Sequence, residues 1–436
     1  MVQPRVIPRA EHTLSRRDVD PDALKVLYRL READHIAYLV GGSVRDLLLG
    51  RRPKDFDIGT SAHPYQVKKL FRNCWIIGRR FRLAHVKFGQ KVIEVATFRR
   101  QVQPGEEIVQ EGVPVPDATT PEGEHLIHRD NTFGTPEEDA FRRDFTINAL
   151  VYDIASFSII DYVDGLEDLH AGVVRSIGDP SVRFLEDPVR MMRAVALAAR
   201  LDFTIDEPIL EAIRLHRHEI AKAAPARLLE EYYKILRAGS GEKTFRRLAE
   251  LGLLEPVSVE LHRGAAEPLW RSLAAVDNYR KRFDSAPETF TNPVLLGSLI
   301  GPIGLIPSSS RPHGALPPEA AGARRRPPKE PVVTLGALPL ARRDVERLGH
   351  VLGLQRRLRD QTLSPRGQRT LVHRHNFREA LTWLEIHGEA PELVEHWNAI
   401  AAEAPPVPAE GEPAEPAPPD APARRRRRRR RRRPSA

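Results

Sequence analysis

The chain has 436 residues, of which 41% are hydrophobic, which is enough for roughly two or three domains with real cores. Its formal net charge is +9, but residues 424–433 are ten consecutive arginines, so the rest carries −1 (9 minus 10) and is not a generally basic nucleic-acid binder. There is no signal peptide, no apolar stretch near the ~18 residues of a membrane span, and only one cysteine. A membrane span and a disulfide framework are therefore excluded, and a reducing cytoplasm is expected.

The first predicted elements lead to a pair of glycines. Asp20-Pro21 opens a helix over residues 22–33, and Ile36–Val40 is predicted as a short buried strand. Gly41-Gly42 then lets the backbone approach a triphosphate with no Cβ in the way, and Arg45 offers a fork of donors to phosphate oxygens. A glycine pair alone is more often a tight turn, so a phosphate-binding role requires further motifs along the chain.

Two aspartates flank a phenylalanine in the next segment. In Asp55-Phe56-Asp57, strand alternation predicts both carboxylates on one face and Phe56 in the core. Neighbouring carboxylates repel each other unless a cation lies between them, and magnesium prefers such oxygen ligands. A pair of these ions activates an attacking hydroxyl and stabilises a leaving pyrophosphate. An isolated Asp-x-Asp is more often a solvated turn, so only the joint pattern favours a metal site.

The joint pattern carries a family resemblance. GGSVRD at residues 41–46 followed by KDFDIGT at residues 54–60 resembles the head domain of class II nucleotidyltransferases of the polymerase-beta superfamily. That group comprises bacterial poly(A) polymerases and the enzymes that add CCA to tRNA. The resemblance implies an α+β fold, with a small mixed sheet in a polymerase-beta-like head followed by an all-α neck and body. It also implies two Mg²⁺ ions at Asp55 and Asp57, and ATP as a substrate that Gly42 and Arg45 help to bind.

A basic segment separates the two branches of this family. Residues 77–86, IGRRFRLAHV, contain Arg79, Arg80 and Arg82 and resemble the bacterial poly(A) polymerase branch. The CCA-adding branch usually has a shorter and less basic phrase there. These arginines are expected to follow the RNA backbone or the triphosphate, and a solvated basic loop is the alternative.

A third carboxylate is expected near the metal. Lys91–Phe98 is predicted as a strand, with Glu94 between apolar neighbours on both sides. Burying an unpaired charge is costly, so this glutamate is expected to have a partner. The resemblance implies that Glu94 is a metal ligand or supports one, and a salt bridge to Arg99 is the alternative.

The next motif combines an arginine with an acidic residue. Residues 140–150, AFRRDFTINAL, place Arg143 and Asp144 ahead of an apolar stretch that is predicted to be helical. The resemblance implies that Arg143 contacts the triphosphate and that Asp144 belongs to the active site. A capped helix start, with Asp144 as the N-cap, is the alternative.

A helix start further on carries groups that can read a base. Asp187 is predicted at the N-cap and Pro188 at the first helical position, with Arg190 and Arg193 on the same face. A carboxylate accepts from an exocyclic amino group and an arginine donates to ring nitrogens or a carbonyl, so the resemblance implies nucleotide selection by Asp187 and Arg190, with Arg193 facing phosphate. The family often has another arginine where this chain has Ala196. A solvated ion pair on a helix is the alternative.

The C-terminal half is predicted to be helical, with two proline-rich interruptions. Arg227 resembles a neck residue that meets RNA and base, and a final helical unit carries Arg369, Arg374 and Arg378 as candidate RNA contacts. The predicted organisation has five parts: an N-terminal extension at 1–20, the nucleotidyltransferase head at 21–165, a nucleotide- and RNA-binding neck at 166–240, a body at 241–400 with a flexible insertion at 306–331, and a disordered tail at 401–436.

The expected function is template-independent addition of AMP from ATP to RNA 3′ hydroxyl ends, with release of pyrophosphate. A CCA-adding tRNA nucleotidyltransferase is the second hypothesis, and a non-catalytic RNA-binding protein is the third. Expected partners are RNA 3′ ends and ATP, with no membrane. An RNA chaperone or RNA-degradation machinery is a candidate partner, and a cytoplasmic monomer is expected.

Overall fold

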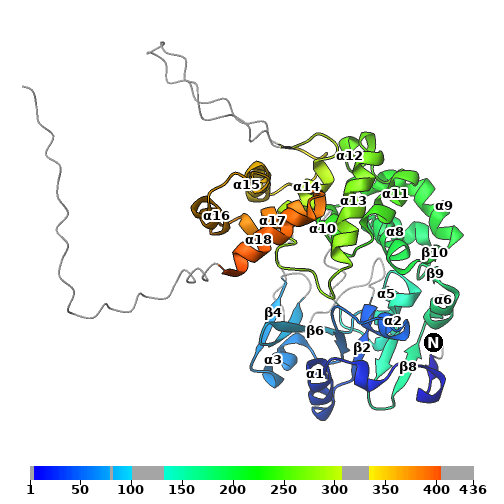
Figure 1. Cartoon of the computed structure of the whole chain (residues 1–436). Coiled ribbons are helices and arrows are strands. Elements are labelled where there is room, and N and C mark those ends of the chain that lie inside the picture. The colour runs from blue at the N-terminus through cyan, green and yellow to red at the C-terminus, as the bar shows by residue number, and fades with distance from the viewer. Residues whose placement is uncertain (1–3, 79–81, 101–131, 307–332, 404–436) are drawn as a thin grey trace, which may run out of the picture.

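The computed structural model describes residues 4–78, 82–100, 132–306 and 333–403. Its N-terminal part is built on an eight-stranded sheet in the order β1-β8-β7-β2-β3-β6-β5-β4 (Figure 1). Adjacent strands are antiparallel except β3 and β6, which are parallel. The strands are β1 (Arg5–Ile7), β2 (Ala37–Val40), β3 (Asp57–Thr60), β4 (Cys74–Ile77), β5 (Leu83–Phe88), β6 (Lys91–Thr97), β7 (Val151–Asp153) and β8 (Ser158–Asp161).

Helices then dominate the chain. The sheet region also contains α1 (Pro21–Glu32), α2 (Gly42–Leu48), α3 (Pro64–Leu70), α5 (Pro136–Arg142) and α6 (Gly165–Ala171). A parallel pair, β9 (Val173–Val174) and β10 (Thr204–Ile205), lies among the next helices. These helices are α7 (Pro180–Glu186), α8 (Val189–Leu201), α9 (Glu207–His216), α10 (Pro225–Arg237), α11 (Gly241–Glu250), α12 (Val259–Arg263), α13 (Glu267–Arg280), α14 (Asn292–Ile300), α15 (Arg342–Leu358), α16 (Pro365–Val372), α17 (Phe377–His387) and α18 (Pro391–Glu403).

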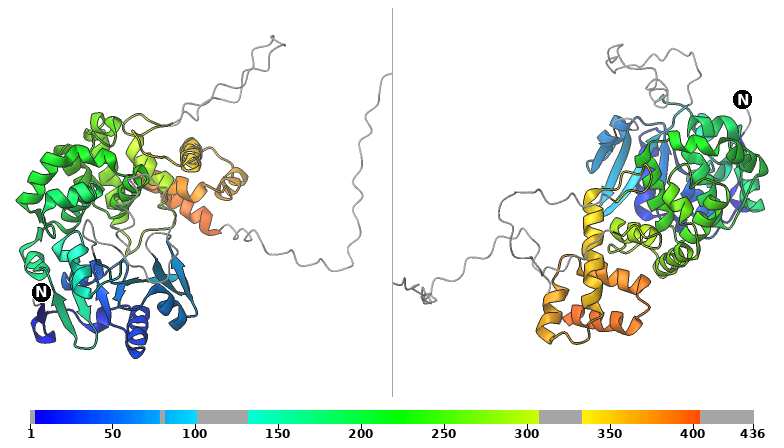
Figure 2. Two further views of the ribbon diagram at one scale, coloured as in Figure 1. Left: turned by 180° about the vertical axis from the view of Figure 1, so that it is seen from behind. Right: turned by 90° about the horizontal axis from the view of Figure 1, so that it is seen from above.

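The predicted α+β fold with a mixed sheet and an all-helical remainder is confirmed. One hydrophobic core extends from Ile7 in β1 through the sheet and the central helices to Ile386 in α17. A second, smaller core forms within α15–α18, where Trp397 packs against Phe377. Figure 2 shows α15–α18, in yellow to orange, against the green helices and far from the N-terminal strand. No helix among the described residues is both long and apolar enough to cross a membrane.

Local sequence signals explain how the first elements form. The Asp20 carboxylate accepts from the backbone N–H groups of Asp22 and Ala23, and Pro21 occupies the first turn of α1. This confirms the predicted helix. Strand β2 begins at Ala37, one residue later than predicted, because Ile36 is exposed. Gly41 follows with φ = 74°, a left-handed turn that glycine adopts without strain, and α2 begins at once.

Two predicted element boundaries are wrong. The helix expected after Arg143 lies before it, because Thr135 and Glu138 form a capping box that starts α5 at Pro136. Only a short 3₁₀ turn, Thr146–Asn148, follows Arg143.

Helix α8 begins at Val189 rather than at Pro188, so Asp187 is not its formal N-cap. The Asp187 carboxylate nevertheless accepts from the Val189 backbone N–H at 3.3 Å and so closes the first turn.

Three predictions lie outside the described residues. They concern Arg79 and Arg80, nearly all of the insertion at 306–331, and the tail beyond residue 403; residues 401–403, predicted to be disordered, are the end of α18. The five-part division of the chain stays a prediction.

Candidate active site

Asp57 is the first residue of β3, and its carboxyl group lies in a field of negative charge. Strands β3 and β6 pair in parallel with Ile58 opposite Val95, which brings Asp57 beside Glu94. Burial, the charge of Glu94 and the charge of Asp55 together raise the pKa of Asp57 to about 6, whereas Arg143 acts to lower it. The sequence motifs for the two aspartates, Glu94 and Arg143 therefore meet at the end of one strand pair.

The other two carboxylates are more exposed than predicted. Asp55 precedes β3, so strand alternation does not apply to it; its side chain is 70% exposed and lies 3.8 Å from Lys54 Nζ. Glu94 was expected to be buried, but its side chain is 49% exposed because its face of the sheet is open to solvent. Its partner is His85, whose Nε2 lies 3.6 Å from Glu94 Oε1, rather than Arg99.

The donor set fits a hard cation that also binds phosphate. Among the described residues, no three Asp, Glu, His or Cys side chains form a group that could enclose a metal ion. Magnesium usually takes only one or two carboxylates and fills its other positions with water and substrate phosphates. Burial and the charges of Glu94 and Asp55 raise the pKa of Asp57 more than Arg143 lowers it, as expected of a carboxylate whose charge a bound cation would balance.

Arg143 lies directly against the glycine turn. Its Nη1 donates to the Asn148 carbonyl at 3.1 Å, and its Nε and Nη2 donate to Asp139 at 3.3 and 3.1 Å. A Cβ on Gly41 would lie only 2.8 Å from Nη1 of Arg143. The glycine is therefore needed both for its backbone conformation and for the space that the arginine occupies.

Arg45 is buried and bonded to other side chains of the protein, and its contact with a triphosphate stays a prediction. Only 3% of the residue is exposed, and its guanidinium donates to Asp46 Oδ1 at 2.8 and 2.6 Å and also to the Asn148 side chain. Burial lowers the pKa of Arg45, partly offset by Asp46. In this structure Arg45 therefore ties α2 to the turn at Asn148, and a Cβ on Gly42 would be in ordinary van der Waals contact with Arg45 Nη2, at 3.4 Å.

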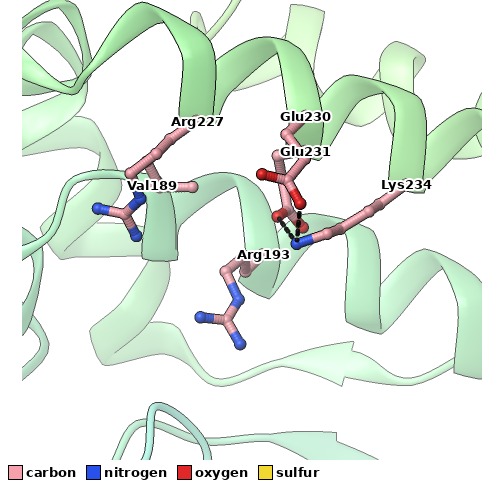
Figure 3. A pocket seen from close by; sticks show the side chains of 6 residues that line it. All are labelled: Val189, Arg193, Arg227, Glu230, Glu231 and Lys234. Carbon is pink, nitrogen blue, oxygen red and sulfur yellow. Dashed lines mark ion pairs between the residues drawn. The ribbon is translucent and has the colours of Figure 1, made fainter. Parts of the chain in front are cut away.

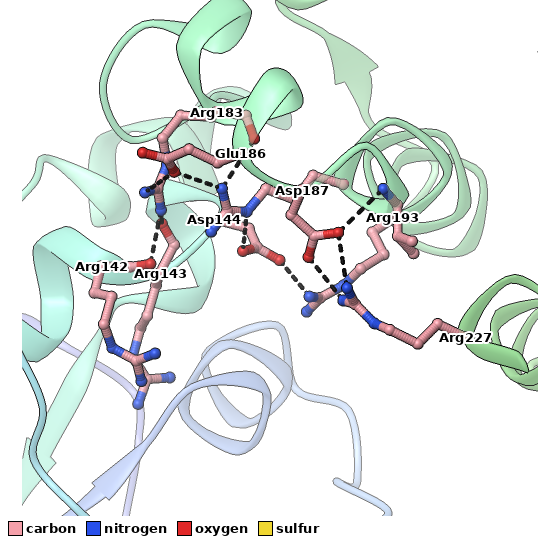
Figure 4. Close-up of polar contacts among 10 residues, drawn as sticks. Arg142, Arg143, Asp144, Arg183, Glu186, Asp187, Arg193 and Arg227 are labelled. Atoms are coloured by element: carbon pink, nitrogen blue, oxygen red, sulfur yellow. Dashed lines mark hydrogen bonds and ion pairs between the residues drawn. The ribbon is translucent and has the colours of Figure 1, made fainter. Parts of the chain in front are cut away.

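Asp144 joins the predicted base-reading helix rather than the aspartates of β3. Its Oδ1 accepts from Arg190 Nε at 2.9 Å, and its Oδ2 lies 2.5 Å from Arg193 Nη1 (Figure 4). Besides burial, the groups that shift the pKa of Asp57 are Glu94, Asp55 and Arg143, and the place of Asp144 in the active site stays a prediction. Arg190 and Arg193 do share a helix face as predicted, but the carboxylate that they share is Asp144.

Asp187 has a different partner. Arg227, in the first turn of α10, donates from Nη1 to Asp187 Oδ1 at 3.0 Å and from Nη2 to Oδ2 at 2.7 Å (Figure 4). This two-bond geometry is the strong form of an arginine–carboxylate pair. The two residues singled out in separate segments thus form one unit between α8 and α10.

Sequence reasoning missed Arg183, which holds this region together. Arg183 is buried on α7 and its Nη2 donates to the carbonyl oxygens of Arg142 and Arg143, both at 2.7 Å. Its Nη1 donates to Glu186, which also accepts from Arg190. Nothing in the sequence distinguishes Arg183 from a surface arginine paired with Glu186 three residues on.

Two adjoining pockets border this network. The first is lined by residues of α8 and α10, namely Val189, Arg193, Arg227, Glu230, Glu231 and Lys234 (Figure 3). The second shares Arg193 and Lys234 and reaches down to Arg45 and Arg200. Ala196 lines this second pocket, so the missing arginine leaves space there.

The remaining predicted RNA contacts lie away from these pockets. Arg82 stacks over the Tyr65 ring at 5.9 Å. Arg369, Arg374 and Arg378 are exposed on α16 and around the start of α17. Their contact with RNA stays a prediction.

Comparisons with known proteins agree with this architecture. Residues 37–175 match a family described as the poly A polymerase head domain, residues 202–263 match a probable RNA and SrmB-binding site of polymerase A, and residues 335–433 match the polymerase A arginine-rich C-terminus. In the solved structure of the Bacillus stearothermophilus CCA-adding enzyme, 23% identity and a TM-score of 0.55 over 88% of this chain and 83% of that one show the same fold.

Curated relatives come from both branches. Poly(A) polymerase I of Salmonella typhi is 52% identical over 253 residues, which are 58% of this chain and 53% of the relative. The corresponding enzyme of Haemophilus influenzae is 45% identical over 57% of this chain and 54% of the relative. The CCA-adding enzyme of Lactobacillus helveticus is 38% identical over 55% and 56%. The chain thus spans about half the length of the curated relatives it matches. Three family matches in consecutive order and the identity to poly(A) polymerase I show that the chain belongs to the poly(A) polymerase family of nucleotidyltransferases, to which the CCA-adding enzymes are related.

Proposed function

We propose that this chain adds AMP from ATP to the 3′ hydroxyl of RNA without a template and releases pyrophosphate. The observation that carries the proposal is the concentration of charge at Asp57, where Glu94 and Asp55 oppose its ionisation and Arg143 favours it. That pattern suits a metal-assisted nucleotidyl transfer. The higher identity to poly(A) polymerases than to CCA-adding enzymes supports RNA tailing as the outcome.

The reaction makes one bond and breaks one. The RNA 3′ oxygen bonds to the α-phosphorus of ATP, and the bond from that phosphorus to pyrophosphate breaks. Bound Mg²⁺, expected as two ions, would acidify the hydroxyl and neutralise charge on the leaving group. Asp57 and Asp55 would hold the metal, with Glu94 beside them. Arg143, already near Asp57, would donate to the triphosphate.

We assign nucleotide selection to the start of α8. Asp187 Oδ1 accepts from both Arg227 Nη1 and the Val189 N–H, whereas Oδ2 accepts only from Arg227 Nη2 and keeps a second lone pair for an exocyclic amino group. Arg190 is fixed by Asp144 before any base arrives, so its geometry is set in advance. Arg193 lines both pockets and would face phosphate.

A CCA-adding activity is the second candidate, since the Lactobacillus helveticus relative, 38% identical over 55% of this chain, is a CCA-adding enzyme. One assay separates the two: the purified chain receives either a short unstructured RNA or a tRNA lacking its CCA end, with each NTP supplied alone. Long tails made from ATP alone support the proposal, whereas incorporation of CTP into the shortened tRNA would support the second candidate.

The same assay with a substituted chain tests the third candidate, a non-catalytic RNA-binding protein. Asp55→Ala should abolish AMP transfer and leave RNA binding intact, because the Asp55 side chain is 70% exposed and its ion pair with Lys54, at 3.8 Å, is long. Retained transfer in this variant would contradict a role for Asp55 at the metal. RNA 3′ ends, ATP, an RNA chaperone or degradation partner, a cytoplasmic location and a monomeric state belong to the same proposal.

A further inference from the structure

A row of four side chains crosses the sheet from Asp57 to its open edge. Asp57 in β3 adjoins Glu94 in β6, Glu94 pairs with His85 in β5, and His85 pairs with Trp75 in β4. Directly paired residues of neighbouring strands point to the same face of a sheet. Trp75 therefore lies on the face that carries the carboxylates, three strand spacings or about 14 Å from Asp57.

The β4 end of this face is apolar and exposed. Trp75 is 53% exposed, and Ile77, two residues on, is 50% exposed. Val92, two residues before Glu94, is 42% exposed. The alternate residues Cys74 and Ala84 are buried on the other face, so the exposure follows strand alternation and is not a frayed edge.

The same face also offers positive charge. Lys87 is exposed and lies two residues from His85, on the side of β5 that faces Trp75 diagonally. An aromatic ring beside a cation is how proteins hold single-stranded nucleic acid, because the ring stacks on a base and the cation meets a phosphate. Trp75 and Ile77 thus form an exposed apolar surface in line with the carboxylates, and a surface of this kind suits a flat apolar ligand.

We infer that Trp75 is a stacking subsite for a base of the RNA that is being extended, close to but not at its 3′ end. The inference rests on the proposed function. Stacked nucleotides rise about 3.4 Å each, so 14 Å from Asp57 corresponds to about four nucleotides upstream of the reacting end. Trp75 is thus an RNA-binding residue rather than a catalytic one, and it takes any base because every base has a π-face.

The test compares Trp75→Ala and Trp75→Phe with Val6→Ala in the full chain. Val6 is the control, because it is 55% exposed but lies on β1, the edge strand at the other end of the sheet from β4. The KM for octaadenylate, the KM for diadenylate, the KM for ATP and kcat are measured. Base stacking is lost in Trp75→Ala, so the KM for octaadenylate should rise about 5- to 150-fold. Trp75→Phe and Val6→Ala should keep a KM for octaadenylate near wild type, and kcat and the KM for ATP should stay near wild type in all three variants.

The comparison between the short and the long RNA primer is decisive. Diadenylate is too short to reach Trp75, so Trp75→Ala should leave its KM unchanged. Equal losses with both primers, or no loss with octaadenylate, would overturn the inference, and the latter would favour a protein partner on this face.

Binding is also measured without ATP. Octaadenylate should quench a part of the tryptophan fluorescence that is absent in Trp75→Phe, whereas an identical response in both would overturn the inference. Because this readout needs no turnover, a chain that transfers no AMP yet shows the quenching would refute the proposed function and keep the subsite. If the chain adds AMP to RNA but substitutions of Trp75 have no effect, the stacking subsite would be refuted and the proposed function kept.

Discussion

The ionised carboxylate of Asp57 destabilises the folded protein when no cation is bound. Burial and the neighbouring carboxylates Glu94 and Asp55 disfavour its ionised form and raise its pKa from 3.8 to about 6. Since the folded pKa lies above the unfolded value, the cost is absent below pH ~4, develops as the pH rises, and is complete above pH ~6. The site is thus less stable at neutral pH than it would be with a neutral residue, which is usual where function requires uncompensated charge.

Replacing this carboxylate should stabilise the metal-free protein. We expect Asp57→Asn to raise the free energy of unfolding at pH 7.5 by about 2–3 kcal/mol, with the gain shrinking towards zero near pH 4, while AMP transfer is lost. Urea unfolding at several pH values, in the presence of a chelator, measures the effect. Asp55→Asn is the control and should change stability little, because that side chain is 70% exposed. A loss of stability in Asp57→Asn at pH 7.5 would show that its charge is compensated after all.

At the scale of elements, the site depends on how turns and helix ends are joined. Gly41 connects β2 to α2, Arg45 ties α2 to the turn at Asn148, and Arg183 ties α7 to the end of α5. Each of these connections is made either by a backbone conformation or by a buried guanidinium with fixed partners. The ligand-facing side chains therefore take their positions from contacts that do not themselves touch a ligand.

The role of Gly41 in the turn between β2 and α2 can be tested by comparison with a second glycine, Gly50. Gly41→Ala should destabilise the fold by more than Gly50→Ala and should raise the KM for ATP, because its new Cβ would meet Arg143 Nη1 at 2.8 Å. Gly50 has φ = 65° but nothing within 4 Å of a Cβ, so its variant shows the conformational strain alone, about 1 kcal/mol. Thermal unfolding and steady-state kinetics give both comparisons. Equal effects of the two substitutions would mean that Arg143 moves aside freely.

Truncation of the Arg183 side chain should destabilise the connection between α7 and the end of α5. Arg183→Ala leaves two buried carbonyl groups, those of Arg142 and Arg143, without their bonds at 2.7 Å. We expect a loss of about 2–4 kcal/mol in the free energy of unfolding, measured by urea titration. Arg214→Ala is the control, since Arg214 and its partner Glu207 are both exposed and the pair should contribute under about 1 kcal/mol. Similar small effects at both positions would contradict a role for Arg183 in connecting α7 to the end of α5.

Local signals made part of this structure predictable. The Asp20-Pro21 start of α1 and the glycine turn after β2 follow from neighbouring residues, and the α+β class follows from the motifs. The start of α5 is also encoded locally, by Thr135 with Glu138 three residues later, and this capping box is a signal that the predicted elements did not include.

Other features depend on contacts between distant segments. The parallel pairing of β3 with β6 puts Glu94 beside Asp57, and no local pattern specifies that register. The partners of Asp144, Arg45 and Arg183 likewise lie 40 or more residues away, apart from Asp46 next to Arg45 and Glu186 three residues after Arg183. Sequence could name these residues but could not say whether each would meet a ligand or another side chain.

At the scale of the whole molecule, a shared core joins the sheet to the helices, and charge is distributed very unevenly along the chain. The core that contains Ile7 also contains Ile386, so the sheet and most helices are packed as one unit. The formal charge of +9 comes from ten arginines at 424–433, outside the described residues, because the rest of the chain carries −1 (9 minus 10). Long-range attraction to RNA should therefore reside in the tail, whereas chemistry resides in the folded part.

Truncation after residue 403 separates these two contributions. The full chain should bind single-stranded RNA with a steep dependence on salt, and truncation should make the slope of log K against log salt less steep by up to about 7, the value for ten phosphate contacts on a single strand. Fluorescence anisotropy of a labelled oligoadenylate across salt concentrations measures both slopes. Replacement of the ten arginines by lysines is the control and should keep the slope, because counterion release depends on charge rather than on the guanidinium group. The truncated chain should still transfer AMP to saturating RNA, because Asp57, Glu94 and Arg143 lie in the part that remains. If the two slopes were equal, the arginines would not contact RNA phosphates, and attraction would have to come from local basic clusters on the folded part.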